Sequence, residues 1–367
     1  MIAVPLRRAG LVVTAALAAL LALATPAAAH GADAPDATDY RAQVSTLSPA
    51  PRGLTARMVE AGARLELTNT TGRDVEVLGY SGEPYLRIGP GGVYENSRSP
   101  ATYLNRTLAG DTPLPAEADP AATPVWRKVS EDRSARWHDQ RARWLESDLP
   151  AQVTADPTRE QRVRDWVVPL RDGDQAIEVR GTLDWVPPPD PYPWWVAGTL
   201  GFLLVGAAGL VPAGTLAGAR ALRGVGALLA LGGLAAVTSS VGRALDAGAD
   251  GVGGVLVGLL GGQTWALLTG LGALVAGGYA LARRPAADFA LALAGACLAL
   301  FAGVANLAVL SRSVVPAPWP AGLARILVTL VLAAGAGALA TGLLRLHTAS
   351  RTAHRAPHPT HPTPVPH

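Results

Sequence analysis

The stretch from residue 164 to residue 211 reads RDWVVPL-RDGDQ-AIEVRGTLDW-VPPPDPYPWW-VAGTLGFLLVGAAGLV and joins two kinds of structure. Two runs typical of β-strands, Arg164–Leu170 and Ala176–Trp185, are separated by five polar residues that include Asp-Gly, a pair favoured in hairpin turns. A Pro-rich segment follows, and then an apolar run, Trp195–Val211, that is long enough to cross a bilayer. The stretch therefore predicts a β domain connected by a stiff spacer to a membrane-spanning helix.

The region before this hairpin contains further strand patterns. Apolar and polar residues alternate in Arg64–Thr68 and Val75–Val77, and two runs, Pro124–Ser130 and Ser134–Trp144, are joined by a short polar turn. Seven or so strands with irregularly spaced turns predict an immunoglobulin-like β-sandwich over residues 30–186, followed by a spacer at 187–193. Five tryptophans are expected to anchor the core or a strand face: Trp126, Trp137, Trp144, Trp166 and Trp185.

The region after the spacer predicts an α-helical transmembrane bundle of about five helices over residues 194–346. The third apolar run is too long and rich in glycine, so we expect its span to begin near Gln263 or Thr264. Ionisable side chains are absent from the middle of the spans, which favours a packed anchor over a transporter. The five runs are Trp195–Val211, Ala221–Val241, Val252–Ala282, Phe289–Leu310 and Leu323–Leu344.

Arginine placement predicts the orientation in the cell membrane. One side of the five passes has more arginines than the other, and the positive-inside rule makes the richer side cytoplasmic. The β domain is then extracytoplasmic, and the His- and Pro-rich tail at 347–367 is a disordered cytoplasmic segment. Asp288, at the start of the fourth run, is expected to pair with the neighbouring Arg283 and Arg284. The poorer side contains Arg243, Arg312 and Arg325.

The overall charge divides in the same way as the hydropathy. The segment from His30 to Asp190 has 19 basic and 25 acidic residues, whereas the chain from Pro191 onward has 10 arginines and three aspartates. The sequence pI of about 9.3 therefore reflects membrane topology, and no nucleic-acid partner is expected. The single cysteine, Cys297, lies in an apolar run, so the β domain has to be stabilised without disulfides.

Residues 1–29 have the three parts of a secretory signal peptide. Arg7 and Arg8 are followed by the apolar run Leu11–Leu23 and by Ala27-Ala28-Ala29, a site suited to signal peptidase. Cleavage after Ala29 would make His30 the first residue of the mature chain. The alternative is an uncleaved anchor, for which the apolar run is short.

A loop system between residues 79 and 105 is rich in Asn, Gly, Pro and Tyr. Such loops on a sandwich carry recognition residues, but shaped turns need the same residue types, and the sequence leaves both interpretations open. The candidate binding residues of these loops are Tyr80, Glu83, Tyr85, Asn96, Tyr103 and Asn105.

These loops, together with Pro124–Ser130 and the Trp-His-Asp-Gln-Arg segment at 137–141, resemble an uncharacterised group of actinobacterial exported membrane proteins. In that group the segment usually reads Trp-His-Asp-His-Arg, so Gln140 stands here in place of a second histidine. The resemblance covers nearly the whole chain and implies no known activity. A mature N-terminal histidine on a small sandwich with a Trp-Arg-x-Val-Ser strand is also similar to periplasmic copper-binding proteins of the CopC type.

Two functions compete on this sequence. The first is an extracytoplasmic interaction or structural module of the envelope, which contacts a protein partner through the loops. The second is Cu(II) binding by the amine and imidazole of His30 together with His138, and with Asp139 as a ligand or orienting group. An enzyme is not expected, because the sequence has no nucleophile elbow, metalloprotease helix or phosphate-binding loop.

Overall fold

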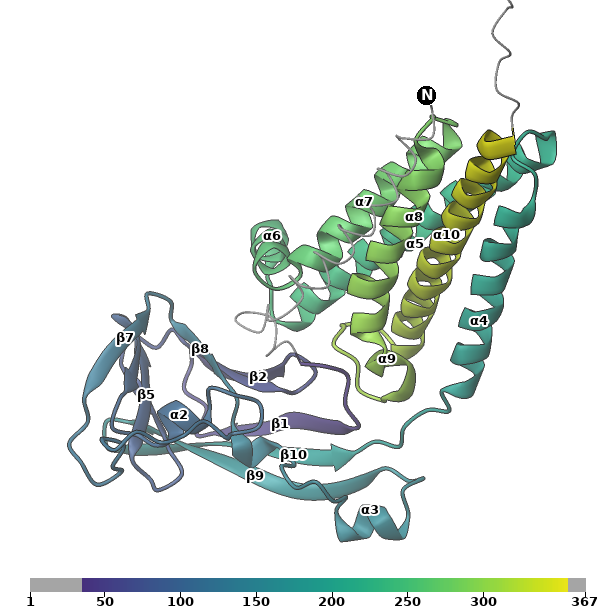
Figure 1. Ribbon diagram of the computed structural model, residues 1–367. Coiled ribbons are helices and arrows are strands. Elements are labelled where there is room, and N and C mark those ends of the chain that lie inside the picture. The colour runs from purple at the N-terminus through teal and green to yellow at the C-terminus, as the bar shows by residue number, and fades with distance from the viewer. Residues whose placement is uncertain (1–34, 356–367) are drawn as a thin grey trace, which may run out of the picture.

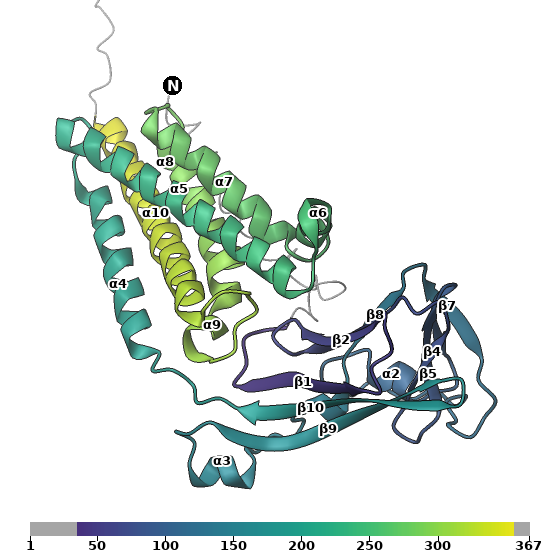
Figure 2. The same ribbon diagram turned by 180° about the vertical axis from the view of Figure 1, so that it is seen from behind.

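The computed structural model describes residues 35–355 as a β domain and a helical bundle that meet at one end of the bundle (Figure 1). The strands nearest to the helices are β1 (Tyr40–Ser48) and β2 (Leu54–Val59), as both views show (Figure 2). The predicted signal peptide, His30 and the end of the tail lie outside the described residues.

Ten strands in the described residues form two antiparallel sheets. The large sheet has the order β1-β10-β9-β4-β5-β6-β7 and the small sheet has the order β2-β3-β8. The remaining strands are β3 (Arg64–Asn69), β4 (Val75–Leu78), β5 (Pro84–Gly89), β6 (Gly92–Asn96), β7 (Trp126–Ser130), β8 (Ser134–Trp137), β9 (Gln161–Asp172) and β10 (Gln175–Trp185).

The predicted hairpin is present as β9 and β10. Asp172 pairs with Gln175, which leaves a two-residue loop in which Gly173 has a φ of 58°. A positive φ at the first loop residue is the type II′ geometry that glycine favours. On its other side β10 pairs with β1, from Tyr40 opposite Trp185 to Ser48 opposite Glu178, so the first and last strands of the domain are neighbours.

The core lies between the two sheets, which confirms the predicted β-sandwich. Leu65 and Leu67 of the small sheet belong to the same buried cluster as Val75, Val168 and Val179 of the large sheet. An immunoglobulin sandwich divides its strands about four and three, whereas the described strands divide seven and three. Three of the five tryptophans are buried, while Trp126 and Trp144 are half-buried: the buried ones are Trp137, Trp166 and Trp185.

The two runs on either side of residue 132 were expected to form neighbouring strands, but they belong to different sheets. β7 pairs with β6 of the large sheet, and β8 pairs with β3 of the small sheet, so the turn between them crosses from one sheet to the other. The second run was expected to stay extended to Trp144, but its strand ends at Trp137. Asp139 ends it, because its carboxylate caps the short helix η2 (Gln140–Ala142) through the Arg141 amide.

The bundle contains five described helices that are long and apolar enough to cross a membrane, which confirms the predicted number and marks the chain as a membrane protein. These spans are 192–210, 216–246, 264–281, 287–306 and 321–351. The long helices are α4 (Tyr192–Ala207), α5 (Leu216–Asp246), α7 (Thr264–Leu281), α8 (Ala287–Cys297) and α10 (Ala321–Arg355). The shorter ones are α2 (Ala101–Leu104), α3 (Ala151–Ala155), η3 (Ala208–Leu210), α6 (Gly251–Gly262), η4 (Leu298–Gly303), η5 (Val304–Asn306) and α9 (Ala308–Ser311).

Two details of the bundle differ from expectation. The last helix continues to Arg355, so the first residues of the expected disordered tail are helical. Asp288 pairs with Arg345 of α10 at 2.6 Å instead of with Arg283 or Arg284. The reason is close packing of α8 on α10, where Gly342 has no side chain to keep the two helices apart. The expected start of the third span at Thr264 is confirmed, because α6 is a separate helix.

The β domain is attached to the bundle near Asp39, whose side chain is almost fully buried. The Asp39 carboxylate accepts hydrogen bonds from Nη1 of Arg312 at 2.6 Å and from the backbone N–H of Ser313 at 3.0 Å. Thr38 and Val314 exchange two backbone hydrogen bonds of 2.9 and 2.8 Å. The segment that enters the β domain is therefore also bonded to the loop that follows α9.

A second attachment lies at the end of α5. The Asp246 carboxylate accepts a hydrogen bond from the Ala61 N–H at 2.7 Å, and the Asp246 carbonyl accepts one from the Glu60 N–H at 3.1 Å. Two attachments at separate places restrict the movement of the β domain more than a single tether does. They hold β1 and β2 against one end of the bundle.

Candidate functional site: a cleft between the two sheets

A cavity of about 380 Å³ lies where β7 and β8 part, and we call it the sheet cleft. One wall comes from the large sheet, the other from β8, and the loop after α2 borders it. Its volume lies in the range typical of small-ligand sites. The lining includes Arg64, Tyr85, Glu95, Asn105, Arg106, Val129, Arg136, Trp137 and His138.

Three of the predicted site residues meet in this cleft, although they are far apart in the sequence. Tyr85 comes from β5, Asn105 from the end of α2, and His138 from the segment after β8. Tyr85 packs its ring edge-on against Trp137, with the ring centroids 6.3 Å apart. The loop candidates and one metal-ligand candidate thus belong to one site, which the separate predictions did not anticipate.

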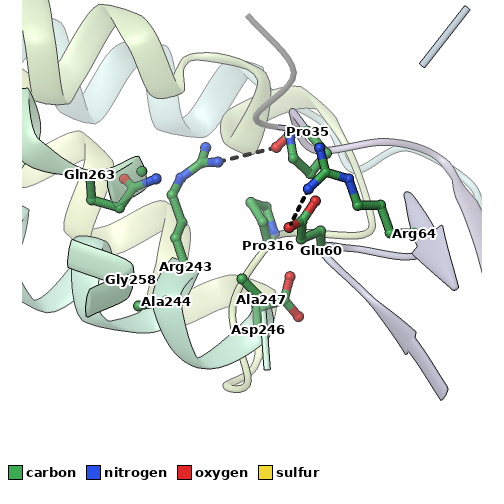
Figure 3. Close-up of a pocket in the computed structure, with 11 residues that line it drawn as sticks. Pro35, Glu60, Arg64, Arg243, Ala244, Asp246, Ala247, Gly258, Gln263 and Pro316 are labelled. Atoms are coloured by element: carbon green, nitrogen blue, oxygen red, sulfur yellow. Dashed lines mark hydrogen bonds and ion pairs between the residues drawn. The ribbon is translucent and has the colours of Figure 1, made fainter. Parts of the chain in front are cut away.

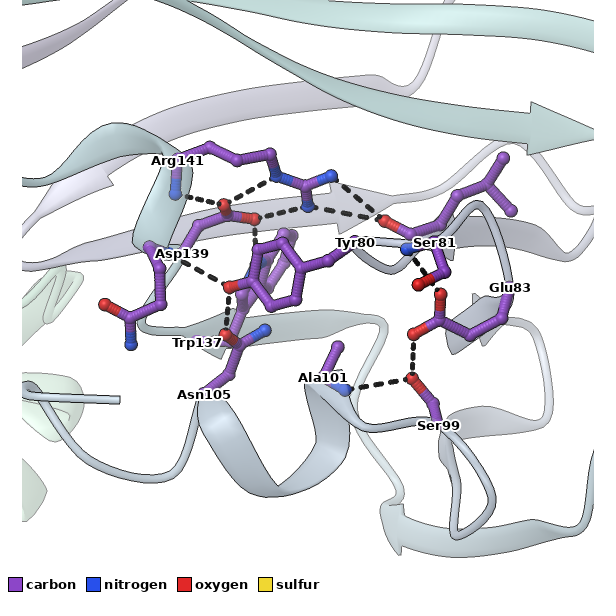
Figure 4. A network of polar contacts seen from close by, with 11 residues as sticks. Tyr80, Ser81, Glu83, Ser99, Ala101, Asn105, Trp137, Asp139 and Arg141 are labelled. Atoms are coloured by element: carbon purple, nitrogen blue, oxygen red, sulfur yellow. Dashed lines mark hydrogen bonds and ion pairs between the residues drawn. The ribbon is translucent and has the colours of Figure 1, made fainter. Parts of the chain in front are cut away.

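Tyr80 and Asp139 lie behind the cleft in a network of polar contacts in which Asp139 is buried and Tyr80 is partly exposed (Figure 4). The Tyr80 hydroxyl donates to Oδ1 of Asn105 and accepts a hydrogen bond from the Gln140 N–H at 3.0 Å. Burial raises the pKa of Tyr80 well above its usual range, and the nearby Asp139 charge acts in the same direction. Tyr80 therefore stays protonated and holds Asn105 in place at the cleft.

Asp139 is the centre of this network. Its side chain is fully buried and accepts hydrogen bonds from Nε1 of Trp137 at 2.9 Å and from Nε and Nη2 of Arg141, both at 2.8 Å. Burial alone would lower the pKa of Arg141, but its hydrogen bonds and charge pairing with Asp139 raise it. Asp139 thus has a structural role here, with its oxygens committed to the protein.

The other loop candidates hold the loops together from inside. Glu83 is buried and accepts hydrogen bonds from the Ser81 N–H at 2.9 Å and the Ser99 hydroxyl at 2.6 Å. Asn96 is buried and donates to the Pro84 carbonyl at 2.7 Å. Tyr103 donates from its hydroxyl to the Ser97 carbonyl at 3.0 Å. These contacts keep the turns in shape, and a recognition role for the three residues stays a prediction.

His138 is buried, and both of its ring nitrogens are engaged. Nδ1 lies 3.0 Å from the Ala63 carbonyl oxygen, and Nε2 lies 3.1 Å from Nε of Arg64. Arginine donates and a carbonyl accepts, so this network assigns the neutral tautomer with the proton on Nδ1. A metal bound at Nε2 would have to displace Arg64.

The copper hypothesis can be tested together with this structural role. We expect His138→Ala to lower the free energy of unfolding by about 1–3 kcal/mol, because it leaves a buried carbonyl and the Arg64 Nε without partners. Cu(II) titration of the full chain, of this variant and of a chain with one residue added before His30 then tests metal binding. Equal losses of affinity in both altered chains support a shared site, and equal affinity in all three excludes it.

Residues 35–355 contain no group of three or more His, Cys, Asp or Glu side chains placed to hold a metal.

The cleft is lined by more positive than negative charge. The lining contains three arginines, Arg64, Arg106 and Arg136, but only one carboxylate, that of Glu95. Arg64 is paired with Glu60 at 3.3 Å and Arg136 is paired with Glu66, whereas Arg106 lies 3.9 Å from Glu95. Arg127 is the closer partner of Glu95.

Arg106 is therefore the cleft arginine with the weakest internal pairing. Its side chain is 48% exposed, and its guanidinium lies over the Tyr103 ring at 4.8 Å from the centroid. Arg106 does not stand out in the sequence, because arginine is scattered along the whole β domain. Its neighbour Asn105 was selected, and only the position of the cleft distinguishes the two.

The buried hydroxyl of Tyr85 is expected to limit the stability of the β domain at alkaline pH. Burial raises the pKa of Tyr85 above its unfolded value of about 10, since the charged form would be poorly solvated. The resulting stabilisation is fully present below about pH 10 and is lost as the pH rises from there toward the folded pKa. We expect the free energy of unfolding to fall above about pH 10, and to fall less steeply in Tyr85→Phe.

This expectation is checked by measuring the unfolding midpoint of the full chain between about pH 8 and 11. Tyr192→Phe is the matched control, because Tyr192 is 71% exposed and loses the same hydroxyl. A pH dependence that is the same in all three proteins would contradict the role of Tyr85.

Comparison with known proteins gives no match: no protein-family model fits the chain, and neither a curated protein nor a solved structure is similar to it.

Proposed function

We propose that the protein is a membrane-anchored interaction module of the cell envelope, which binds an acidic group of an extracytoplasmic protein partner in the sheet cleft. The observation that supports this proposal most is the charge of the cleft. Arg106 lies at its border, half exposed and weakly paired, beside an amide at Asn105 and two aromatic rings. A guanidinium with free donors, next to aromatic surface, is a common centre of protein recognition.

The rigid attachment of the β domain supports the same proposal. Bonds at Asp39 and Asp246 hold the domain on the bundle, so the cleft stays close to the end of the helices. A fixed recognition surface loses less conformational entropy on binding than one on a flexible stalk. The extracytoplasmic location of the β domain is also part of this proposal. It is inferred from the uneven distribution of arginines between the loops on the two sides of the bundle.

Binding without catalysis is also part of the proposal. The titratable groups at and behind the cleft are bonded to other protein groups: His138 to Arg64 and Ala63, and Asp139 to Arg141 and Trp137. A general acid or base has to reach the reacting group directly or through one water. These side chains instead hold the walls of the cleft in position.

The proposal is tested by photo-crosslinking in cells that produce the full chain. The photoreactive residue replaces Val129, which lines the cleft and is 48% exposed. We expect a discrete crosslinked partner whose yield falls about tenfold or more with Arg106→Glu, which places a negative charge in the cleft. Arg159→Glu is the matched control, because Arg159 is exposed on the strand-connecting segment before β9 and does not line the cleft.

The two variants separate recognition from a general effect of charge. A crosslink that survives Arg106→Glu would overturn the proposed role of the cleft, as would the absence of any discrete crosslink. An equal loss with Arg159→Glu would show that the net charge of the domain controls the contact and would equally contradict the site.

A further inference from the structure

A second cavity, of about 160 Å³, lies between the β domain and the helices, and we call it the junction pocket (Figure 3). The β domain contributes Glu60 and Arg64 from the ends of β2 and β3. The end of α5 contributes Arg243 and Asp246, and Gly262 and Gln263 come from the junction of α6 and α7. Since α5 and α7 are membrane spans, the pocket lies at the level where two spans end.

The helix α6 gives this pocket a lipid-facing wall. α6 has 12 residues, all apolar or glycine, and is too short to cross a bilayer. It lies across the direction of the long helices, at the end of α7 nearest the β domain (Figures 1 and 2). Val252, Val257 and Leu260 are 80%, 72% and 68% exposed. A short apolar helix with exposed aliphatic side chains beside membrane spans is typical of the lipid interface.

The pocket also contains two charged groups, Arg243 and Asp246, that form no salt bridge. The Arg243 guanidinium donates to the Pro35 carbonyl at 3.1 Å and to Oδ1 of Asn306 at 3.0 Å, both of which are neutral acceptors. The Asp246 carboxylate accepts from the Ala61 N–H. Among the salt bridges of residues 35–355, neither Arg243 nor Asp246 has an oppositely charged partner within 4.0 Å.

The positions of these charges match one kind of ligand. Figure 3 shows the Arg243 guanidinium turned toward Pro35 and the Asp246 carboxylate apart from it. Charged groups without a salt-bridge partner are costly next to lipid, and a ligand with both signs would give each of them a direct partner. A phosphate suits a guanidinium, and a primary ammonium can donate hydrogen bonds to a carboxylate, which a quaternary ammonium cannot.

From this arrangement we infer that the junction pocket binds the headgroup of a phosphatidylethanolamine molecule. The phosphate contacts Arg243, the ammonium contacts Asp246, and the acyl chains lie along the exposed side of α6. This inference is independent of the sheet cleft, because it concerns a different cavity and a different ligand. It assigns to α6 a role in holding a lipid at the base of the β domain.

Native mass spectrometry of the full chain in mild detergent tests the inference with three probes: phosphatidylethanolamine, phosphatidylglycerol and free phosphoethanolamine. We expect one molecule of phosphatidylethanolamine to bind about tenfold more tightly than phosphatidylglycerol, a difference of about 1.4 kcal/mol. Free phosphoethanolamine is expected to bind more weakly than the lipid, because it lacks acyl chains. Equal affinity for the two lipids, or full affinity for the free headgroup, would overturn the inference.

Two neighbouring glycines supply a matched pair of variants. An added Cβ at Gly261 or at Gly262 meets nothing within 4 Å, but only Gly262 lines the pocket. Gly262→Met is therefore expected to weaken phosphatidylethanolamine binding about tenfold, and Gly261→Met to leave it unchanged, at similar melting temperatures. Binding that is the same in both variants would contradict the pocket as the site.

Asp246→Asn tests the contact with the ammonium group. Asparagine keeps an acceptor for the Ala61 N–H, so the attachment of the β domain is retained, but the negative charge is lost. We expect the preference for phosphatidylethanolamine over phosphatidylglycerol to disappear in this variant. If the preference stays at its original value, the carboxylate does not recognise the ammonium, and the assignment of the headgroup is wrong.

Discussion

Asp139→Ala is expected to lower the free energy of unfolding of the β domain by about 3–5 kcal/mol, the cost of removing one partner of a buried ion pair. Asp139 is fully buried, and the Arg141 side chain is only 20% exposed. Alanine would leave the guanidinium of Arg141 and the indole N–H of Trp137 without their acceptor. The short helix η2 would also lose its cap.

The effect can be measured by hydrogen exchange in β9, an inner strand of the large sheet, in the full chain, since its slowest amides report unfolding of the whole domain. The free energy of unfolding of Asp139→Asn is expected to lie between those of Asp139→Ala and the natural protein, because asparagine keeps one acceptor. Asp165→Ala is the control: Asp165 is 76% exposed in its pair with Arg162, and such surface pairs contribute less than about 1 kcal/mol. Similar exchange rates in Asp139→Ala and Asp165→Ala would contradict the central role of Asp139.

Asp39→Ala is expected to loosen the β domain from the bundle without unfolding either part. The Ser313 N–H and Arg312 would lose a charged acceptor that is almost completely buried. Hydrogen bonds to charged groups contribute about 1.5–3 kcal/mol, and we take about 2 kcal/mol because Arg312 is half exposed. The undocked population would then rise by about 30-fold.

Two backbone amides report this opening directly. The N–H groups of Thr38 and Val314 bond across the junction, so their exchange should accelerate by about 30-fold in Asp39→Ala while exchange in β9 stays the same. Glu178→Ala provides the comparison, because Glu178 is 41% exposed and pairs only with Arg180 within the same strand. Unchanged exchange at Thr38 and Val314 would show that Asp39 does not hold the junction.

The sequence predicts the fold well where a local pattern determines it. The Asp-Gly pair predicted the β9–β10 hairpin, because a tight turn has few solutions and glycine at 173 supplies the required positive φ. Spans were predictable from length and apolarity alone. The end of β8 could not be predicted in this way. Asp139 ends the strand through a capping hydrogen bond, and such a contact is not visible in the spacing of hydrophobic residues.

The candidate site was predicted in part, for a physical reason. Turn residues such as Glu83 and Asn96 are polar because backbone groups of nearby loop residues need hydrogen-bond partners, so the composition of these turns resembles that of a recognition loop. Arg106 was missed because arginines are frequent and carry no periodic signal. Its importance depends on where β7 and β8 part, and that depends on pairings between strands far apart in the sequence.

The pairing of β1 with β10 also sets an order of events during synthesis. Tyr40 pairs with Trp185, so the large sheet cannot be completed until nearly all of the domain has left the ribosome. Pairings over such long stretches of chain form slowly. The bond between Thr38 and Val314 waits still longer, because Val314 follows the fourth span. The segment at the start of the domain is therefore made first and reaches its final partner only after most of the helices exist. During that interval the newly made strands need protection from aggregation.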